Sequence, residues 1–220
     1  HVRSRRQRQM CIRDRFNINR ADQDQFALTS QQRTAAAQAR GFFDKEIIAV
    51  EIPQRKGEPV VVAKDEHPRA STTAEALAKL KPVVKADGTV TAGNASGIND
   101  GAAALLIASD EAVAQHGLKP RAKIIGSTVV GVEPRIMGFG PAPAIKKLLA
   151  QTGLTLEQMD VIELNEAFAA QALACTRDLG IEDGSEKVNP NGGAIALGHP
   201  LGASGARLVT TALNLSLIHI

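Results

Sequence analysis

The sequence of 220 residues contains neither tryptophan nor tyrosine, and its only aromatic residues are six phenylalanines. Proteins that bind single-stranded nucleic acid stack bases on aromatic side chains along a basic groove. Residues 1–15 hold six arginines and one acid, a charge of +5, so the other residues carry −2 of the total of +3. Because the rest of the chain has neither a basic stripe nor a stacking platform, we expect no nucleic-acid partner.

Long apolar runs and cysteines are also scarce. No stretch approaches the roughly 20 apolar residues of a membrane-spanning helix, and the first residues are too charged for a signal peptide. We therefore expect no membrane partner and a cytoplasmic location. Cys11 and Cys175 are the only cysteines, without CxxC or metal-type spacing. They predict a reducing compartment, no disulfide framework and no metal site.

Both ends of the chain look foreign to the rest. Residues 9–15 (QMCIRDR) and 215–220 (LSLIHI) resemble translated sequencing-adapter read-through at the ends of assembled DNA. We therefore interpret residues 1–15 and 214–220 as non-native tails and expect a gene cut at both ends. The alternative is a basic disordered tail and a frayed last helix, which leaves the fold prediction unchanged.

Alternating patterns between the ends predict an α/β fold with mostly parallel strands and a domain boundary near Pro120. Apolar periodicity, caps and turn residues predict the individual elements. They are a helix over 22–40, a hairpin within 46–64, helices over 74–80 and 110–116, a strand over 122–132, a helix over 143–152, a strand over 161–164 and a helix over 166–179.

The most informative segment is residues 189–207, which contains five glycines. Glycine weakens both helices and strands, so these residues indicate a shaped loop. Phosphate binding is a weak interpretation, since the segment lacks the Gly-Lys-Ser/Thr ending of a nucleotide loop. His199 lies in a rigid turn between Gly198 and Pro200 and is the best general acid–base candidate. The alternative is a buried histidine bonded to backbone.

A second polar group lies in residues 164–170, at a strand-to-helix junction. One interpretation is structural, with Asn165 as helix N-cap and Glu166 in the first turn, where it complements the helix dipole. The other is functional, because open α/β sheets place their sites at the carboxyl ends of strands. Spacing alone does not separate the two.

Three segments of the chain resemble motifs of the thiolase family, in the family's order. They are residues 91–103 (TAGNASGINDGAA), residues 165–169 (NEAFA) and residues 198–205 (GHPLGASG). The resemblance covers about residues 16–213. It implies a thiolase-like layered α-β-α-β-α fold, truncated at both ends. Residues 16–120 would form the rear part of the N-terminal domain with its loop region, and residues 121–213 a truncated C-terminal domain.

The same resemblance assigns roles to the polar residues. The histidine equivalent to His199 activates a nucleophilic cysteine and helps to bind the thioester oxygen. The asparagine equivalent to Asn165 holds a water that completes this oxyanion site. Donors aimed at a developing enolate oxygen stabilise the charge of a Claisen transition state.

Four further residues are implied to bind coenzyme A. Arg69 would lie near its nucleotide end, and Ser96, Ala167 and Phe168 along its pantetheine arm. A structural explanation also exists for three of them: a solvated loop charge for Arg69, a turn for Ser96 and core packing for Phe168.

The cysteines of thiolase catalysis are absent from this chain. The family's nucleophile lies upstream of the resembled region, and its second catalytic cysteine lies downstream. Cys11 falls in the suspect head, and Cys175 sits in a helical pattern typical of a small buried residue. We therefore expect the 220-residue chain to be inactive.

The resemblance implies an acyl-CoA C-acyltransferase, with acyl-CoA and CoA as partners, no cofactor, and a homodimer or homotetramer when complete. Residues 65–73, 132–138 and 169–173 most resemble 3-oxoadipyl-CoA thiolases of aromatic degradation. One alternative is an acetoacetyl-CoA thiolase; another is a non-catalytic thiolase-like protein that binds CoA or lipid. The β-ketoacyl-carrier-protein synthases differ because they place a histidine at the position of Asn165.

Overall fold

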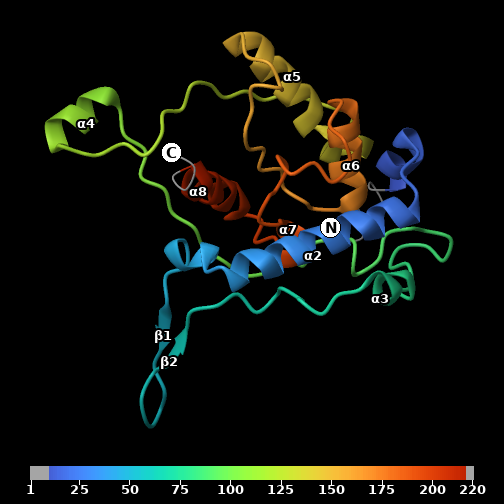
Figure 1. Cartoon of the computed structure of the whole chain (residues 1–220), viewed down its shortest axis with the longest axis horizontal. Helices are drawn as coiled ribbons and strands as arrows, with labels where there is room; N and C mark the ends of the chain where they lie inside the picture. Colours follow the sequence, from blue (N-terminus) through green and yellow to red (C-terminus); the bar gives the residue numbers. More distant parts are fainter. Residues whose placement is uncertain (1–9, 217–220) are drawn as a thin grey trace.

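The computed structural model describes residues 10–216. Figure 1 shows the arrangement of its elements. In chain order they are α2 (Arg20–Ala39), η1 (Phe42–Lys45), β1 (Val50–Ile52), β2 (Val60–Val62), α3 (Ala74–Ala78), α4 (Asp110–His116), η2 (Pro134–Phe139), α5 (Pro141–Thr152), α6 (Ala169–Asp178), α7 (Ala194–Leu197) and α8 (Ser204–Ser216).

Helix α2 organises the core. Asn19 caps its start, because the Asn19 side chain accepts the backbone N–H of Asp22 at 2.8 Å. The helix ends before Gly41, whose φ of 70° is a conformation that glycine adopts without strain. Helix α2 packs against α3, α6, α7 and η1, and Figure 1 shows it running lengthwise past α6 and α7.

The buried face of α2 is partly polar. Its apolar members pack with Leu77, Ala169 and Ile195 into a core cluster. Its buried polar residues need hydrogen-bond partners from other elements, since an unpaired buried polar group is destabilising. Those residues are Gln23, Asp24, Ser30, Gln31 and Thr34.

The structure confirms most of the predicted elements. Strands β1 and β2 form the antiparallel hairpin, with Val50 opposite Val62. The helices near 22–40, 74–80, 110–116 and 143–152 form with shifts of a few residues at their ends. Cys175 is fully buried within α6, as the helical pattern around it predicted.

The predicted strand over 122–132 is wrong. Those residues form no strand, and Ile124, Ile125 and Val129 are each at least 67% exposed. A strand exists only when a neighbour pairs with its backbone, and no segment among residues 10–216 pairs with this one. The predicted strand over 161–164 is reduced to one parallel bridge between Ile162 and Val188, because only Ile162 of these four residues has a paired partner in the described part of the chain.

The first described residues pack into the core. Residues 10–16 are helical, and Ile12 is fully buried against Ile136 and Ala174. The proposed non-native status of residues 1–15 and 214–220 stays a prediction, and residues 1–9 and 217–220 lie outside the described part. Across residues 10–216, no helix combines the length and apolar character required to cross a membrane.

Candidate active site

Two of the predicted residues meet at the centre of the site. The side-chain nitrogen Nδ2 of Asn165 lies 3.3 Å from Nε2 of His199. Asn165 follows the bridge at Ile162, and His199 follows α7, so the contact joins segments 34 residues apart. Both side chains are half-buried. An amide donor beside an imidazole nitrogen is an arrangement that suits an oxyanion or a proton transfer.

The turn that carries His199 requires glycine at position 198. Gly198 has a φ of 96°, and an added Cβ would lie 2.5 Å from Oδ1 of Asn99. The same Asn99 oxygen accepts the backbone N–H of His199 at 3.2 Å. The turn therefore touches the segment of residues 91–101 directly. On its other side, Nδ1 of His199 lies 2.6 Å from Oγ of Ser204 at the start of α8.

Three predicted CoA-binding residues also lie together. The backbone N–H and the hydroxyl of Ser96 both donate to the carbonyl oxygen of Ala167, at 3.1 and 3.0 Å. Ala95, the residue before Ser96, forms an antiparallel bridge with Phe168, the residue after Ala167. Residues 91–101 thus lie beside residues 167–168, and they touch the turn of His199 through Asn99.

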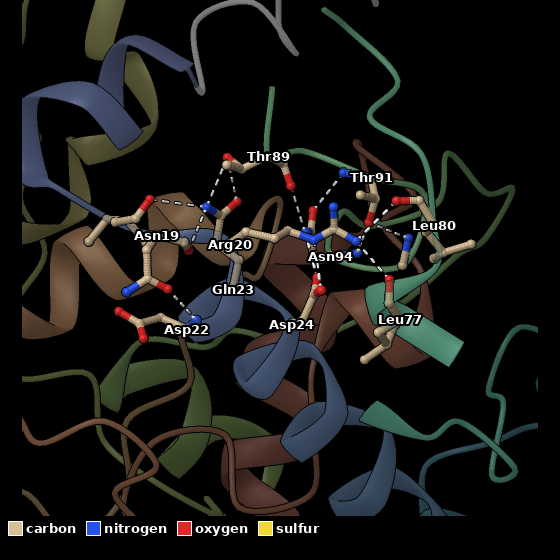
Figure 2. A network of polar contacts seen from close by, with 12 residues as sticks. Asn19, Arg20, Asp22, Gln23, Asp24, Leu77, Leu80, Thr89, Thr91 and Asn94 are labelled. Carbon is tan, nitrogen blue, oxygen red and sulfur yellow. Dashed lines mark hydrogen bonds and ion pairs between the residues drawn. The ribbon is translucent and has the colours of Figure 1, made fainter. Parts of the chain in front are cut away.

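A polar network pins residues 89–94 to α2 (Figure 2). The amide of Asn94, which is 1% exposed, donates to Oδ1 of Asp24 and to the carbonyl of Thr89, both at 2.9 Å. The Oδ1 of Asn94 accepts the backbone N–H of Thr91 at 2.8 Å. Arg20 pairs with the other oxygen of Asp24 at 2.7 Å. The network fixes the base of the loop that presents Ser96.

Arg69 stands apart from this group. Its side chain is exposed, and its backbone N–H donates to Oε1 of Gln31 at 2.9 Å. The loop that carries it is held on α7, because Nδ1 of His67 donates to the carbonyl of Ala196 at 2.9 Å. The role of Arg69 at the nucleotide end of CoA stays a prediction.

The structural interpretation of Asn165 and Glu166 is wrong. Helix α6 begins at Ala169, so neither residue lies at its N-cap or in its first turn, and Phe168, at the N-cap position, makes no side-chain cap. Spacing alone misplaced the start of the helix, because the backbone of residues 167–169 is bonded to residues 94–96 instead.

Glu166 is instead a buried carboxylate that binds three residues from other parts of the chain. Its carboxylate accepts the hydroxyl of Ser30 at 2.6 Å, the amide of Asn189 at 2.9 Å and the backbone N–H of Ile195 at 3.2 Å. Burial raises the pKa of Glu166, while these three bonds oppose that shift. A Cβ on Gly193 would lie 2.4 Å from the carboxyl carbon of Glu166, so this glycine makes room for the carboxylate.

Sequence reasoning missed Ser30, Asn189 and Asn99. Ser30 is 136 residues from its partner Glu166, and Asn99 is 100 residues from its partner His199. Asn189 has a φ of 46°, and its amide also donates to the carbonyl of Leu164 at 2.7 Å. The one available signal was that Asn189 opens the glycine-rich segment, since asparagine tolerates this conformation better than most residues.

A second carboxylate, Glu163, lies behind the site. Its Oε2 is 3.4 Å from Nη1 of Arg207 on α8, and its side chain is only 4% exposed. Burial raises the pKa of Glu163 to about 8, and the Arg207 guanidinium lowers it only in part. The pair joins the segment that carries Asn165 to the helix that follows the turn of His199.

The buried Oδ1 of Asn165 accepts no hydrogen bond within residues 10–216. A buried acceptor beside Nε2 of His199 fits an asparagine that holds a water molecule or a substrate group. In the same part of the chain, no group of three His, Cys, Asp or Glu side chains could hold a metal ion. The geometry fits proton transfer and oxyanion binding.

Family models account for almost the whole chain. "Thiolase, N-terminal domain" matches residues 9–111, and "Thiolase, C-terminal domain" matches residues 118–217. The chain belongs to the thiolase family. Its three sequence motifs all lie within the residues that these two family models match.

Curated thiolases are similar over most of this chain. Beta-ketoadipyl-CoA thiolase of Acinetobacter baylyi is 80% identical over 203 residues, which are 92% of this chain and 51% of the relative. Acetyl-CoA acetyltransferase of Chromobacterium violaceum is 56% identical over 200 residues, 91% of this chain and 50% of the relative. The chain spans about half the length of the curated relatives that it matches.

Solved thiolase structures confirm the fold. Acetyl-CoA acetyltransferase of Bacillus anthracis matches with a TM-score of 0.92 and 45% identity, over 97% of this chain and 54% of that protein. Human mitochondrial 3-ketoacyl-CoA thiolase in complex with CoA matches with a TM-score of 0.86 and 42% identity, over 97% of this chain and 52% of that protein. The described backbone therefore follows a thiolase fold, although the strand over 122–132 is not formed.

Proposed function

We propose that this chain supplies the histidine and oxyanion part of a thiolase, an acyl-CoA C-acyltransferase. In that reaction a 3-oxoacyl-CoA and CoA give acetyl-CoA and a shortened acyl-CoA, or the reverse condensation takes place. The observation that carries the proposal is the 3.3 Å contact between Asn165 Nδ2 and His199 Nε2, at the meeting point of the three family motifs.

In the proposed mechanism His199 takes the proton of a nucleophilic cysteine. The thiolate then forms an acyl-cysteine intermediate, and the acyl group passes to CoA in a ping-pong sequence. His199 and a water held by Asn165 bind the thioester oxygen of the substrate, where charge accumulates in the transition state. Neither cysteine of the chain fits the nucleophile, because burial raises the pKa of Cys175 to about 11 and Cys11 lies outside the family motifs.

CoA binding is proposed for the surface beside the bond between Ser96 and Ala167. The similarity to a thiolase solved in complex with CoA supports CoA as a ligand of the complete protein. The extended backbone of residues 95–96 and 167–168 offers polar groups next to Phe168, which suits a pantetheine arm with amides along an apolar chain. Arg69 is proposed to meet the nucleotide end from its exposed loop.

The proposed substrate is 3-oxoadipyl-CoA. The 80% identity to the beta-ketoadipyl-CoA thiolase of Acinetobacter baylyi supports it over acetoacetyl-CoA. The relative from Chromobacterium violaceum, at 56% identity, keeps acetoacetyl-CoA thiolysis as the second candidate. We further propose acyl-CoA and CoA as partners, no cofactor, a homodimer or homotetramer of complete subunits, and a cytoplasmic location.

A segment exchange tests the proposal. The 203 residues that align would replace their counterpart in the Acinetobacter baylyi relative, which supplies the rest of a complete enzyme. We expect this chimera to cleave 3-oxoadipyl-CoA faster than acetoacetyl-CoA. A folded chimera without thiolysis would contradict the function, and a preference for acetoacetyl-CoA would overturn only the substrate. CoA binding without turnover would favour the non-catalytic alternative.

Matched variants locate the chemistry within the chimera. His199→Asn should lower kcat by about 10²–10⁴, the typical contribution of general acid–base catalysis. Asn165→Ala should lower kcat by about 10²–10³, as expected for the loss of an oxyanion donor. His116→Asn on α4 and Asn17→Ala are the controls, since both side chains are exposed. Full activity in His199→Asn would refute the assigned role.

A further inference from the structure

We propose that Ser204 is a positioning residue that holds His199 in its Nδ1–H tautomer, so that the lone pair of Nε2 faces Asn165. The inference deepens the proposed function and rests on it, because it concerns the base of the same site. The sequence placed Ser204 within a family motif but gave it no role.

The directions of the hydrogen bonds carry the inference. The structure orients the amide of Asn165 with its donor nitrogen Nδ2 toward the ring, 3.3 Å from Nε2, and in this orientation Nε2 accepts and bears no hydrogen. A neutral imidazole then carries its hydrogen on Nδ1, which lies 2.6 Å from Ser204 Oγ.

The hydroxyl of Ser204 completes the same chain of donors. Its oxygen lies 3.0 Å from the carbonyl oxygen of Pro200, which can only accept, so the hydroxyl hydrogen is assigned to this contact and the oxygen accepts from Nδ1. The bonds therefore run from Asn165 to His199, from His199 to Ser204 and from Ser204 to Pro200, each with one donor and one acceptor. Reversing one of them would set two hydrogens or two lone pairs against each other.

The position of Ser204 is rigid. Ser204 is 5% exposed and is the first residue of α8. The backbone N–H groups of Ala203 and Ser204 donate to the carbonyl of Pro200 at 2.8 and 2.9 Å, which closes the turn after His199. The hydroxyl is thereby fixed five residues from the ring that it orients.

The consequence concerns the proton that the histidine must accept. Only an unprotonated Nε2 can take a proton on the side of Asn165, and the other tautomer presents a hydrogen there. Without the hydroxyl of Ser204, the hydrogen on Nδ1 loses its acceptor in a half-buried site, and the Nδ1–H form loses that part of its advantage over the other tautomer and over a rotated ring. Ser204 thus acts through His199 and need not touch a substrate.

Nitrogen-15 NMR of the histidine rings in the full 220-residue chain tests the proposal. Spectra are recorded above pH 8, where neutral imidazole predominates for an unperturbed histidine, and His199→Asn identifies the signals of residue 199 among the five histidines. We expect the shift pattern of the Nδ1–H form in the parent chain. We expect Ser204→Ala to lose that pattern and Ser204→Thr, which keeps a hydroxyl, to retain it.

Thr210→Ala is the matched control. Thr210 lies on the same helix, and its hydroxyl donates to the carbonyl four residues back, as that of Ser204 does, but it donates to Ala206 and not to the turn of His199. This variant should keep the Nδ1–H pattern. If Ser204→Ala unfolds the chain by circular dichroism, Ser204→Cys replaces it, since a thiol is a weak acceptor of similar shape.

Two results would overturn the proposal. One is an Nε2–H pattern for His199 in the parent chain, and the other is an unchanged Nδ1–H pattern in a folded chain without the hydroxyl. Thiolysis is measured separately in the chimera. A wrong tautomer would therefore leave the proposed acyl transfer standing, and an inactive chimera would leave the tautomer result standing.

Discussion

Replacing Asn94 by aspartate should destabilise the chain strongly without a change in side-chain shape. In the network of Figure 2, the amide of Asn94 donates to Asp24 Oδ1 and to the carbonyl of Thr89. Asn94→Asp replaces this donor with an oxygen that faces two acceptors at 2.9 Å. The residue is 1% exposed, so water does not compensate for the change.

Two effects set the size of the loss. A hydrogen bond to a charged group contributes about 1.5–3 kcal/mol, and a neutral one about 1 kcal/mol. Two carboxylates 2.9 Å apart would repel by about 6 kcal/mol at an effective dielectric constant of about 20, an upper limit because the pair can hold a shared proton. We therefore expect a loss of about 3–5 kcal/mol at pH 8, a large part of the stability of a small domain.

The loss should depend on pH. The new carboxyl has a raised pKa in the folded chain, so the folded state binds a proton that the unfolded state releases. Stability is then present below the unfolded pKa and is lost as the pH rises through the folded value. Asn94→Asp should consequently lie closer to the parent chain at pH 5 than at pH 8.

Urea unfolding followed by circular dichroism at both pH values is the assay. Asn17→Asp is the control, because Asn17 is exposed and aspartate tolerates its φ of 54°. Adding Asp24→Asn to Asn94→Asp restores one donor opposite one acceptor and should recover part of the loss, though Arg20 then loses its ion pair. A single variant within about 0.5 kcal/mol of the parent at pH 8, a typical exposed-site change, would refute the reasoning.

Three further predictions follow from single residues. The pKa of Glu163 is raised from 4.5 to about 8, so the stability of the folded chain should fall as the pH rises between these values, by at most about 1.4 kcal/mol per pH unit. Urea unfolding from pH 5 to 8 should show that Glu163→Gln flattens this slope. An unchanged slope would contradict the assignment. Gly198→Ala should lower kcat of the chimera at least about tenfold, because it sets a Cβ against Asn99 at a φ of 96°, whereas Gly153→Ala, with a positive φ but open space, should cost stability and leave kcat unchanged. Ellman's reagent should modify Cys11 before Cys175, which is buried with a pKa raised to about 11; rapid labelling of a folded Cys11→Ser chain would disprove this.

The predictable parts of the fold are those with local causes. The hairpin of β1 and β2 follows from two apolar runs around a turn, and α4 from a serine cap and a terminal glycine. The strand over 122–132 has the same kind of apolar pattern but no partner within residues 10–216. A periodic pattern shows that a segment is suited to a strand, and only a neighbour makes it one.

The site was predictable as a set of motifs and not as a geometry. Residue type and setting singled out His199 and Asn165, and the resemblance added Ser96, Ala167 and Phe168. The bonds that place them connect residues far apart in sequence, such as Ser30 with Glu166 across 136 positions. The start of α6 was misplaced for that reason, since the bond from Ala169 N–H to the carbonyl of Asn94 competes with a helical start at Asn165.

The residues around His199 depend on contacts made within this chain. The imidazole of His199 contacts the hydroxyl of Ser204, and its backbone N–H donates to Asn99. Its neighbour Asn165 lies two residues after Glu163, which pairs with Arg207. The exposed apolar residues of segments 102–108 and 122–132 take no part in these bonds. The tautomer of His199 can therefore be measured in the 220-residue chain, while the proposed acyl transfer is measured in the chimera, which supplies the nucleophile of the relative. The two experiments separate how the base is oriented from what it acts on.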